Sequence, residues 1–97
     1  MVKRKKIKIM KERQITVINS LGIHARPASM IVQTAMKFKS SLWLIKDGAS
    51  ADAKSIMSVM MLAAAYNSKV TIRASGEDEE DAVNAIAALF EKKFNEE

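Results

Sequence analysis

The most reactive group of residues in the sequence is a histidine with a glycine before it and an arginine and a proline after it. These residues are Gly22, His24, Arg26 and Pro27. A ring nitrogen of histidine can attack, hold and release a phosphoryl group, and the planar guanidinium of Arg26 offers donors that suit phosphate oxygens. The residue types therefore fit an exposed site that handles an anion. A single histidine near a helix start is, however, more often an ordinary surface side chain.

The residues that follow His24 predict the helix that would position it. Apolar residues recur at three- and four-residue spacing from Ala25 to Phe38, which indicates an amphipathic helix. Pro27 falls in its first turn, where the missing N–H costs nothing and the fixed φ suits a helix. His24 thus lies at or just before the first helical residue, beside unpaired backbone N–H groups and the positive end of the helix dipole.

A serine and a group of methionines form a second candidate region. Ser55 directly precedes an apolar segment, residues 56–66, that we expect to be a helix, so Ser55 is the expected N-cap. A phosphate on Ser55 would pair with free N–H groups and leave the helix intact, while adding negative charge to the surface. The helix is too short to bury every face, so its large apolar residues are candidates both for the core and for partner contacts. They are Ile56, Met57, Met60 and Met61.

The periodicity of the rest of the chain predicts an α+β protein. Asp47-Gly48 is a strong hairpin signal between two short strands, and the acidic run of residues 77–81 suits the start of a last helix. Because strands this short need antiparallel pairing, we expect an open-faced β-sandwich in the order β-α-β-β-α-β-α, with helices on one face of a four-stranded antiparallel sheet. The expected strands are residues 14–19, 41–46, 49–53 and 69–74. The expected buried face of the last helix is Ala82, Val83, Ile86, Leu89, Phe90 and Phe94.

Composition excludes several classes of site. The 97 residues include no cysteine and one histidine, so disulfides, thiolate metal sites and multi-histidine metal centres are excluded. We expect no metal and no cofactor. No apolar run approaches the roughly 20 residues of a membrane-spanning helix, and the basic start lacks the apolar core of a signal peptide. We therefore expect a single-domain cytoplasmic protein with no membrane partner.

Positive charge is concentrated at the start of the chain. The net charge is +5, but residues 1–13 carry seven basic residues and one acidic residue, whereas the remainder carries nine basic and ten acidic residues. We expect residues 1–13 to be a flexible basic extension and residues 14–97 to be the folded domain. Such an arm can hold nucleic acid or an anionic membrane through charge alone, or it can be a solvated tail. We expect no nucleic-acid partner, and a start at Met10 would remove the strongest basic run.

Two segments resemble the signature segments of the HPr family, the histidine phosphocarriers of the bacterial phosphoenolpyruvate-dependent phosphotransferase system. Residues 22–28, Gly-Ile-His-Ala-Arg-Pro-Ala, are similar to the family's phosphorylation site. Residues 53–60, Ala-Lys-Ser-Ile-Met-Ser-Val-Met, are similar to its regulatory serine region. The order of elements and the acidic start of the last helix match too, so the resemblance extends over about residues 14–90.

This resemblance implies a role for each candidate residue. His24 would accept a phosphoryl group on Nδ1 from phospho-Enzyme I and pass it to an Enzyme IIA component for sugar uptake, and Arg26 would contact the phosphate. Ser55 would be phosphorylated by HPr kinase/phosphorylase in bacteria that have that enzyme. The docking contacts would come from Ile56, Met57 and Met60. The protein would be a monomeric carrier with a transient phosphohistidine, not an enzyme, and would bind no small-molecule substrate directly.

Two departures from the family pattern keep alternatives open. Leu21 stands where many HPr proteins carry Ser or Asn, and a Leu-Gly pair before the histidine also occurs in the nitrogen-related branch of the phosphotransferase system. Residues 64–69 lack the glycines that the family usually has there, which predicts a different turn at Asn67. A carrier in that regulatory branch is therefore one alternative. A docking module that is controlled at Ser55 and transfers no phosphate is another.

Overall fold

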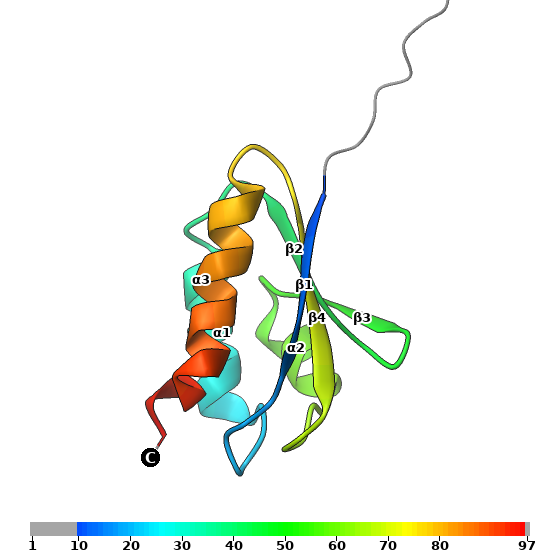
Figure 1. Ribbon diagram of the computed structural model, residues 1–97, viewed down its shortest axis with the longest axis vertical. Helices are drawn as coiled ribbons and strands as arrows, with labels where there is room; N and C mark the ends of the chain where they lie inside the picture. The colour runs from blue at the N-terminus through cyan, green and yellow to red at the C-terminus, as the bar shows by residue number, and fades with distance from the viewer. Residues whose placement is uncertain (1–9, 97) are drawn as a thin grey trace, which may run out of the picture.

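Four strands form a single antiparallel sheet in the computed structural model, which describes residues 10–96 (Figure 1). The strands are β1 (Lys11–Thr16), β2 (Ser41–Lys46), β3 (Ala49–Asp52) and β4 (Lys69–Ser75). Their order across the sheet is β1-β4-β2-β3, so β1 and β3 are the edge strands. Of the two interior strands, β4 pairs with β1 and β2, and β2 pairs with β4 and β3.

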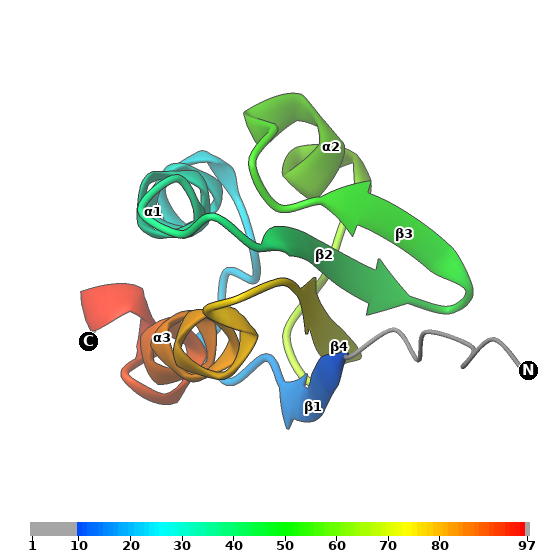
Figure 2. The same ribbon diagram turned by 90° about the horizontal axis from the view of Figure 1, so that it is seen from above.

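Three helices lie on one face of this sheet (Figure 2). They are α1 (Ala25–Ala35), α2 (Ile56–Met61) and α3 (Glu79–Glu91), and a short 3-10 helix, η1 (Lys93–Asn95), follows α3. Helix α1 packs against α2 and α3, and α3 packs against β1 and β4. The predicted fold class, an open-faced α+β sandwich, is therefore confirmed. Within residues 10–96, no helix combines the length and the hydropathy needed to cross a membrane.

The core lies between the sheet and the helices. Alternate residues of β2 and β4 are buried, as the two-residue period of a strand requires. On α3 the predicted face turns inward, although Leu89 is only partly buried. The rings of Phe90 and Phe94 meet edge-on with their centroids 4.9 Å apart, which extends the core beyond the end of α3.

The first strand begins three residues earlier than predicted. We expected residues 14–19, but β1 covers residues 11–16, because pairing with β4 along its whole length fixes its position. Its first four residues are exposed at the edge of the sheet, where charged side chains are common. The prediction relied on β-branched residues, so it did not include these charged positions in the strand. Residues 11–13 thus belong to the sheet and not to the basic extension, whereas residues 1–9 lie outside the described residues.

Two helices end earlier than predicted. Helix α1 stops at Ala35, three residues before the predicted end. Helix α2 was expected to extend to residue 66 but stops at Met61, because Ala63 adopts a left-handed conformation with φ 51°. Asn67 has φ 74°, so the turn before β4 is built without glycine, as the missing glycines had indicated. The segment after α2 therefore runs as a loop toward the residues that precede α1.

Candidate functional site

His24 occupies the N-cap of α1, where its backbone has φ −87° and ψ −167°. The loop before it is fixed against the loop after α2, because the N–H of Ile23 donates to the carbonyl of Ala64 at 2.9 Å. Gly22 has φ +70°, and a Cβ on it would lie 2.6 Å from that same carbonyl oxygen, so this position requires glycine. The side chain of His24 is 38% exposed and can therefore be reached by another molecule.

The first turn of α1 offers hydrogen-bond donors beside His24. Within residues 10–96, the N–H groups of Ala25 and Arg26 donate to no carbonyl, and Pro27 has no N–H. The side chain of His24 makes no capping bond, and the turn contains no acidic residue. Free donors and the positive end of the helix dipole favour an anion. This helix start can thus accommodate an anion next to the imidazole ring.

A carboxylate that the sequence analysis did not single out lies against His24. Oε2 of Glu96 is 2.7 Å from Nε2 of His24 and 3.7 Å from a guanidinium nitrogen of Arg26. Oε1 of Glu96 accepts a hydrogen bond of 3.0 Å from the side-chain amide of Asn19. Arg26 also donates to the carbonyl of Phe94 at 3.2 Å. The C-terminal segment thus contacts one side of the His24 ring through Glu96, and it holds Arg26 beside the ring through Glu96 and the carbonyl of Phe94.

The surroundings of Glu96 keep its carboxylate ionised. Burial, which leaves the side chain 16% exposed, would by itself raise the pKa of this group. The hydrogen bonds from Asn19 and His24, and the charges of His24 and Arg26, outweigh burial and hold the pKa of Glu96 below its ordinary value. At neutral pH Glu96 is therefore an anion that contacts both candidate residues of the site.

A left-handed turn over residues 93–95 brings Glu96 back to His24. The φ values of its three residues are 54°, 54° and 61°, a conformation that residues other than glycine seldom adopt. Phe94 is fully buried and packs against Phe90, so the core anchors the middle of the turn. The position of Glu96 is therefore set by tertiary packing.

Asn19 links this turn to the loop that carries the histidine. Its side chain is fully buried, and Nδ2 donates to the carbonyl of Gly22 at 2.7 Å as well as to Glu96. Its Oδ1 has no hydrogen-bond partner among the described residues. Sequence reasoning missed both Asn19, which looked like a turn residue, and Glu96, which looked like part of a charged end. The one available signal was Phe94, an apolar residue that predicts packing of the C-terminal segment.

Ser55 is the N-cap of α2, as predicted. Its Oγ accepts a hydrogen bond of 3.2 Å from the N–H of Ser58, and its backbone is extended. Next to it, Nζ of Lys54 donates to the carbonyl of Phe38 at 2.9 Å. This bond ties the start of α2 to the segment that follows α1.

The residues expected to dock partners lie on the outer side of α2. Met57 is 65% exposed and Ile56 and Met60 are each 40% exposed, whereas Val59 turns into the core. Met61, at 78% exposure, belongs to the same surface. We call these four residues, Ile56, Met57, Met60 and Met61, the α2 patch. The hydrogen bond between the loops that follow α2 and precede α1 connects this patch to the histidine loop.

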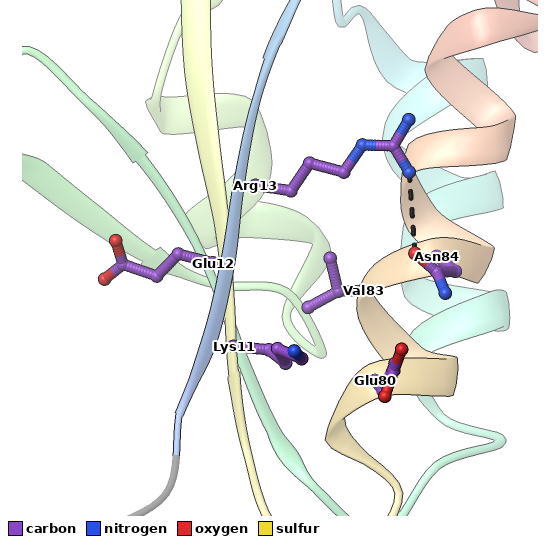
Figure 3. A pocket seen from close by; sticks show the side chains of 6 residues that line it. All are labelled: Lys11, Glu12, Arg13, Glu80, Val83 and Asn84. Carbon is purple, nitrogen blue, oxygen red and sulfur yellow. Dashed lines mark hydrogen bonds between the residues drawn. The ribbon is translucent and has the colours of Figure 1, made fainter.

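A shallow groove lies elsewhere, between β1 and α3 (Figure 3). It is lined by Lys11, Glu12, Arg13, Glu80, Val83 and Asn84. Arg13 points from β1 toward α3, where it donates to Asn84 at 3.5 Å and pairs with Glu91. Because the charges in its lining have both signs, the groove has no preference for an anion. Among residues 10–96, no group of three or more histidine, cysteine or acidic side chains is arranged to hold a metal ion.

The fold and the site place the protein in the class of open-faced α+β domains that carry a histidine at an exposed helix start. Residues 11–92 match the family model described as the PTS HPr component phosphorylation site. The chain therefore belongs to the HPr family, and it is a phosphocarrier of the phosphotransferase system.

Individual relatives agree with this assignment. The chain is 47% identical over 88 residues to the phosphocarrier protein HPr of Xylella fastidiosa, covering 91% of this chain and 99% of that protein. A crystal structure of HPr from Thermoanaerobacter tengcongensis superimposes with a TM-score of 0.86 at 47% identity, over 90% of this chain and 98% of that one. HPr from Bacillus anthracis gives a TM-score of 0.80 at 40% identity, over 84% and 96% of the two chains.

Proposed function

We propose that the protein accepts a phosphoryl group from phospho-Enzyme I on Nδ1 of His24 and passes it to an Enzyme IIA component for sugar uptake. The observation that carries this proposal is the difference between the two ring nitrogens. Nε2 contacts Glu96 at 2.7 Å, whereas Nδ1 has no hydrogen-bond partner among residues 10–96. A nitrogen with a free lone pair is the one that can attack phosphorus.

Arg26 and the start of α1 supply the groups that would receive the phosphate oxygens. The guanidinium of Arg26 is 56% exposed and has five N–H donors, so its bond to Phe94 leaves others free. The helix dipole at an exposed helix start adds about 0.3–1 kcal/mol for a bound anion. An interaction of this size steadies the phosphoryl group without trapping it, as a carrier requires.

The α2 patch is the surface that we propose for docking Enzyme I and the Enzyme IIA component. Its residues remain exposed although they are apolar, while the buried residue of the same helix, Val59, already supplies the contact with the core. Flexible methionine side chains can adjust to different surfaces. Two partners that must use one histidine in turn can therefore share this patch.

The test is phosphoryl transfer from phosphoenolpyruvate through Enzyme I, followed by intact mass and acid lability. We expect the wild-type chain to gain one acid-labile phosphate and His24→Ala to gain none. The His24→Ala variant should keep its fold, since the residue lies at an exposed helix start. An unchanged gain of phosphate in His24→Ala would contradict the proposal, and unfolding of the variant at ordinary temperature would assign His24 a structural role instead.

The nitrogen-related branch is the second candidate, and the exposed side chain of Leu21 beside the histidine loop favours it. A partner of that branch would meet an apolar residue where many HPr proteins present a polar one. The discriminating measurement is the rate of phosphorylation by the two kinds of Enzyme I. A clear preference for the nitrogen-branch donor would replace sugar uptake with a regulatory phosphorelay.

We also propose that phosphorylation of Ser55 by an HPr kinase/phosphorylase regulates docking. Ser55 adjoins the α2 patch, so a phosphate there would add about −1.5 to −2 charge beside the proposed contact surface. We expect Ser55→Asp to slow phosphorylation by Enzyme I with little change in stability, because aspartate also caps helices. Ser55→Ala is the control, since it removes the cap without adding charge. Equal rates for Ser55→Asp and the wild type would dismiss this regulation.

The basic extension is not part of the proposed carrier mechanism. A chain that begins at Met10 keeps all of β1, which starts at Lys11. We expect it to remain a cytoplasmic monomer and to accept phosphate at the wild-type rate. A comparison of the two chains in the same transfer assay, and in a nucleic-acid binding assay, checks this expectation. Loss of transfer in the shorter chain would assign the extension a role in docking.

A further inference from the structure

The contact between Glu96 and His24 determines which ring nitrogen carries the proton. The pKa of Glu96 is held low, so its carboxylate is ionised and can only accept hydrogen bonds. Its Oε2 lies 2.7 Å from Nε2 of His24, and a contact of this length requires a proton between the two atoms. The proton must therefore reside on Nε2. In the neutral ring, Nδ1 is then the nitrogen with the free lone pair.

We propose that Glu96 is a positioning residue for phosphoryl transfer, holding the Nε2–H tautomer of His24 and stabilising the positive charge that the ring acquires. This inference rests on the proposed function, since it assumes that His24 is the phosphoryl acceptor. It adds a residue that acts through the histidine and does not itself touch the phosphoryl group.

The chemical step explains why a carboxylate at Nε2 assists transfer in both directions. The lone pair of Nδ1 forms the N–P bond while the bond from phosphorus to the donor breaks, and that electron pair leaves with the donor. The ring gains one positive charge, and the proton on Nε2 stays in its hydrogen bond to Glu96. When a nucleophile of the acceptor forms its own bond to phosphorus, the N–P bond breaks and its electron pair returns to Nδ1. A fixed negative charge beside the ring stabilises the charged state that both steps pass through.

The protein holds this carboxylate in place from several directions. Asn19 donates to its other oxygen at 3.0 Å from a fully buried position. Arg26 lies 3.7 Å from the oxygen that contacts the ring. The left-handed turn before Glu96 is anchored by the buried side chain of Phe94. Together these constraints restrict the motion of the carboxylate, as a residue that fixes the orientation of a ring nitrogen requires.

The position of Glu96 also limits how it affects the incoming phosphate. It engages Nε2, and the phosphoryl group binds on the opposite ring nitrogen. Arg26 can contact both anions, because its fork has several donors and is 56% exposed. The repulsion between the carboxylate and the phosphate is therefore offset by a shared cation and by the free N–H groups of the first turn of α1.

The direct test is the ¹⁵N spectrum of the imidazole, recorded at alkaline pH where an ordinary imidazole is neutral. In the wild-type protein we expect a protonated Nε2 and an unprotonated Nδ1. Glu96→Gln keeps the size of the side chain but removes the charge, and its amide can also donate to the ring. We therefore expect a measurable rise in the Nδ1–H form. The control is Glu91→Gln, the same change in a glutamate that pairs with Arg13, and it should leave the ring spectrum unchanged.

The second readout is the rate of phosphoryl acceptance from phospho-Enzyme I. We expect Glu96→Gln to be about ten-fold slower, by analogy with carboxylates that orient metal-bound histidines. Glu96→Asp, which restores the charge on a shorter side chain, should recover part of the rate, and Glu91→Gln should match the wild type. An unchanged tautomer or an unchanged rate in Glu96→Gln would overturn the inference. A wild-type protein that shows the expected tautomer but accepts no phosphate would instead contradict the proposed function.

Discussion

Two carboxylates, one at each end of α3, join segments that are distant in sequence, and they have different partners. We call each carboxylate with its hydrogen-bond partners a clasp. Asp78, at the start of α3, accepts hydrogen bonds from the backbone N–H groups of Lys39 and Ser40 and from the hydroxyl of Ser40. Glu96, beyond the end of α3, contacts the side chains of His24, Arg26 and Asn19. Helix α3 runs from the upper to the lower part of the molecule in Figure 1, so its start and its end lie far apart.

The comparison distinguishes a carboxylate that joins two segments of the fold from a carboxylate that contacts the residues of the proposed site. The carboxylate of Asp78 ties the loop before β2 to the start of α3, and its backbone partners have no further chemistry to perform. The partners of Glu96 include an exposed imidazole and an exposed guanidinium, both of which retain free donors or lone pairs. A buried or half-buried carboxylate thus indicates a functional site when its partners are themselves accessible and reactive.

Each clasp has a glycine beside it, and substitution of these glycines should give the largest effects. A Cβ on Gly22 would lie 2.6 Å from the carbonyl oxygen of Ala64, and a Cβ on Gly76 would lie 2.7 Å from Cα of Ser40. Both residues have positive φ. We expect Gly22→Ala and Gly76→Ala each to lower the free energy of unfolding by about 1–3 kcal/mol, from backbone strain alone. Urea denaturation measures this loss.

The two glycine variants should differ in phosphoryl transfer. Gly22→Ala displaces the loop that carries His24, so we expect slower acceptance from Enzyme I even when the rate is normalised to the folded fraction. Gly76→Ala displaces only the Asp78 clasp, so its normalised rate should match the wild type. Equal losses of normalised rate in both variants would show that the two ends of α3 are coupled and that the contacts of Asp78 also affect phosphoryl transfer.

A smaller effect is expected from the charge of Asp78. The hydrogen bond from the Ser40 hydroxyl, followed by that from the Lys39 N–H, lowers the pKa of Asp78 from 3.8 to about 2. Because this pKa is lower in the folded state, the carboxylate stabilises the fold above about pH 4, and this contribution is lost as the pH falls toward 2. Asp78→Asn should be less stable than the wild type at neutral pH, and the difference should shrink over that interval. Denaturation curves at a series of pH values test this, and a difference independent of pH would contradict it.

Much of the fold could be predicted because local periodicity and tertiary packing agree. The apolar spacing of α1 and α3, the Asp47-Gly48 turn between β2 and β3, and the N-cap at Ser55 are all local signals that the structure retains. The prediction of β1 was wrong because edge pairing with β4 overrides a charged sequence. The predicted end of α2 was wrong because Ala63 adopts a left-handed conformation, which an alanine in the sequence does not indicate.

The candidate site could be predicted only in part, for the same reason. His24 and Arg26 are adjacent to a helix start, so their residue types and spacing indicated anion chemistry. Glu96 is 72 positions from His24 in sequence, and it reaches the ring through a left-handed turn of residues other than glycine. The buried side-chain amide of Asn19 donates both to Gly22, in the loop before α1, and to Glu96, in the C-terminal segment. Contacts of this kind depend on the packed structure and have no counterpart in local sequence.

The most direct test of the account is to locate the phosphate after transfer from Enzyme I. The measurement is ³¹P and ¹⁵N NMR of the phosphorylated protein with labelled histidine, in which the nitrogen bonded to phosphorus is identified by its coupling. We predict a single phosphate on Nδ1 of His24, with Nε2 still facing Glu96. A phosphate on Nε2, on Ser55 or on no residue at all would contradict phosphoryl carriage on Nδ1 of His24.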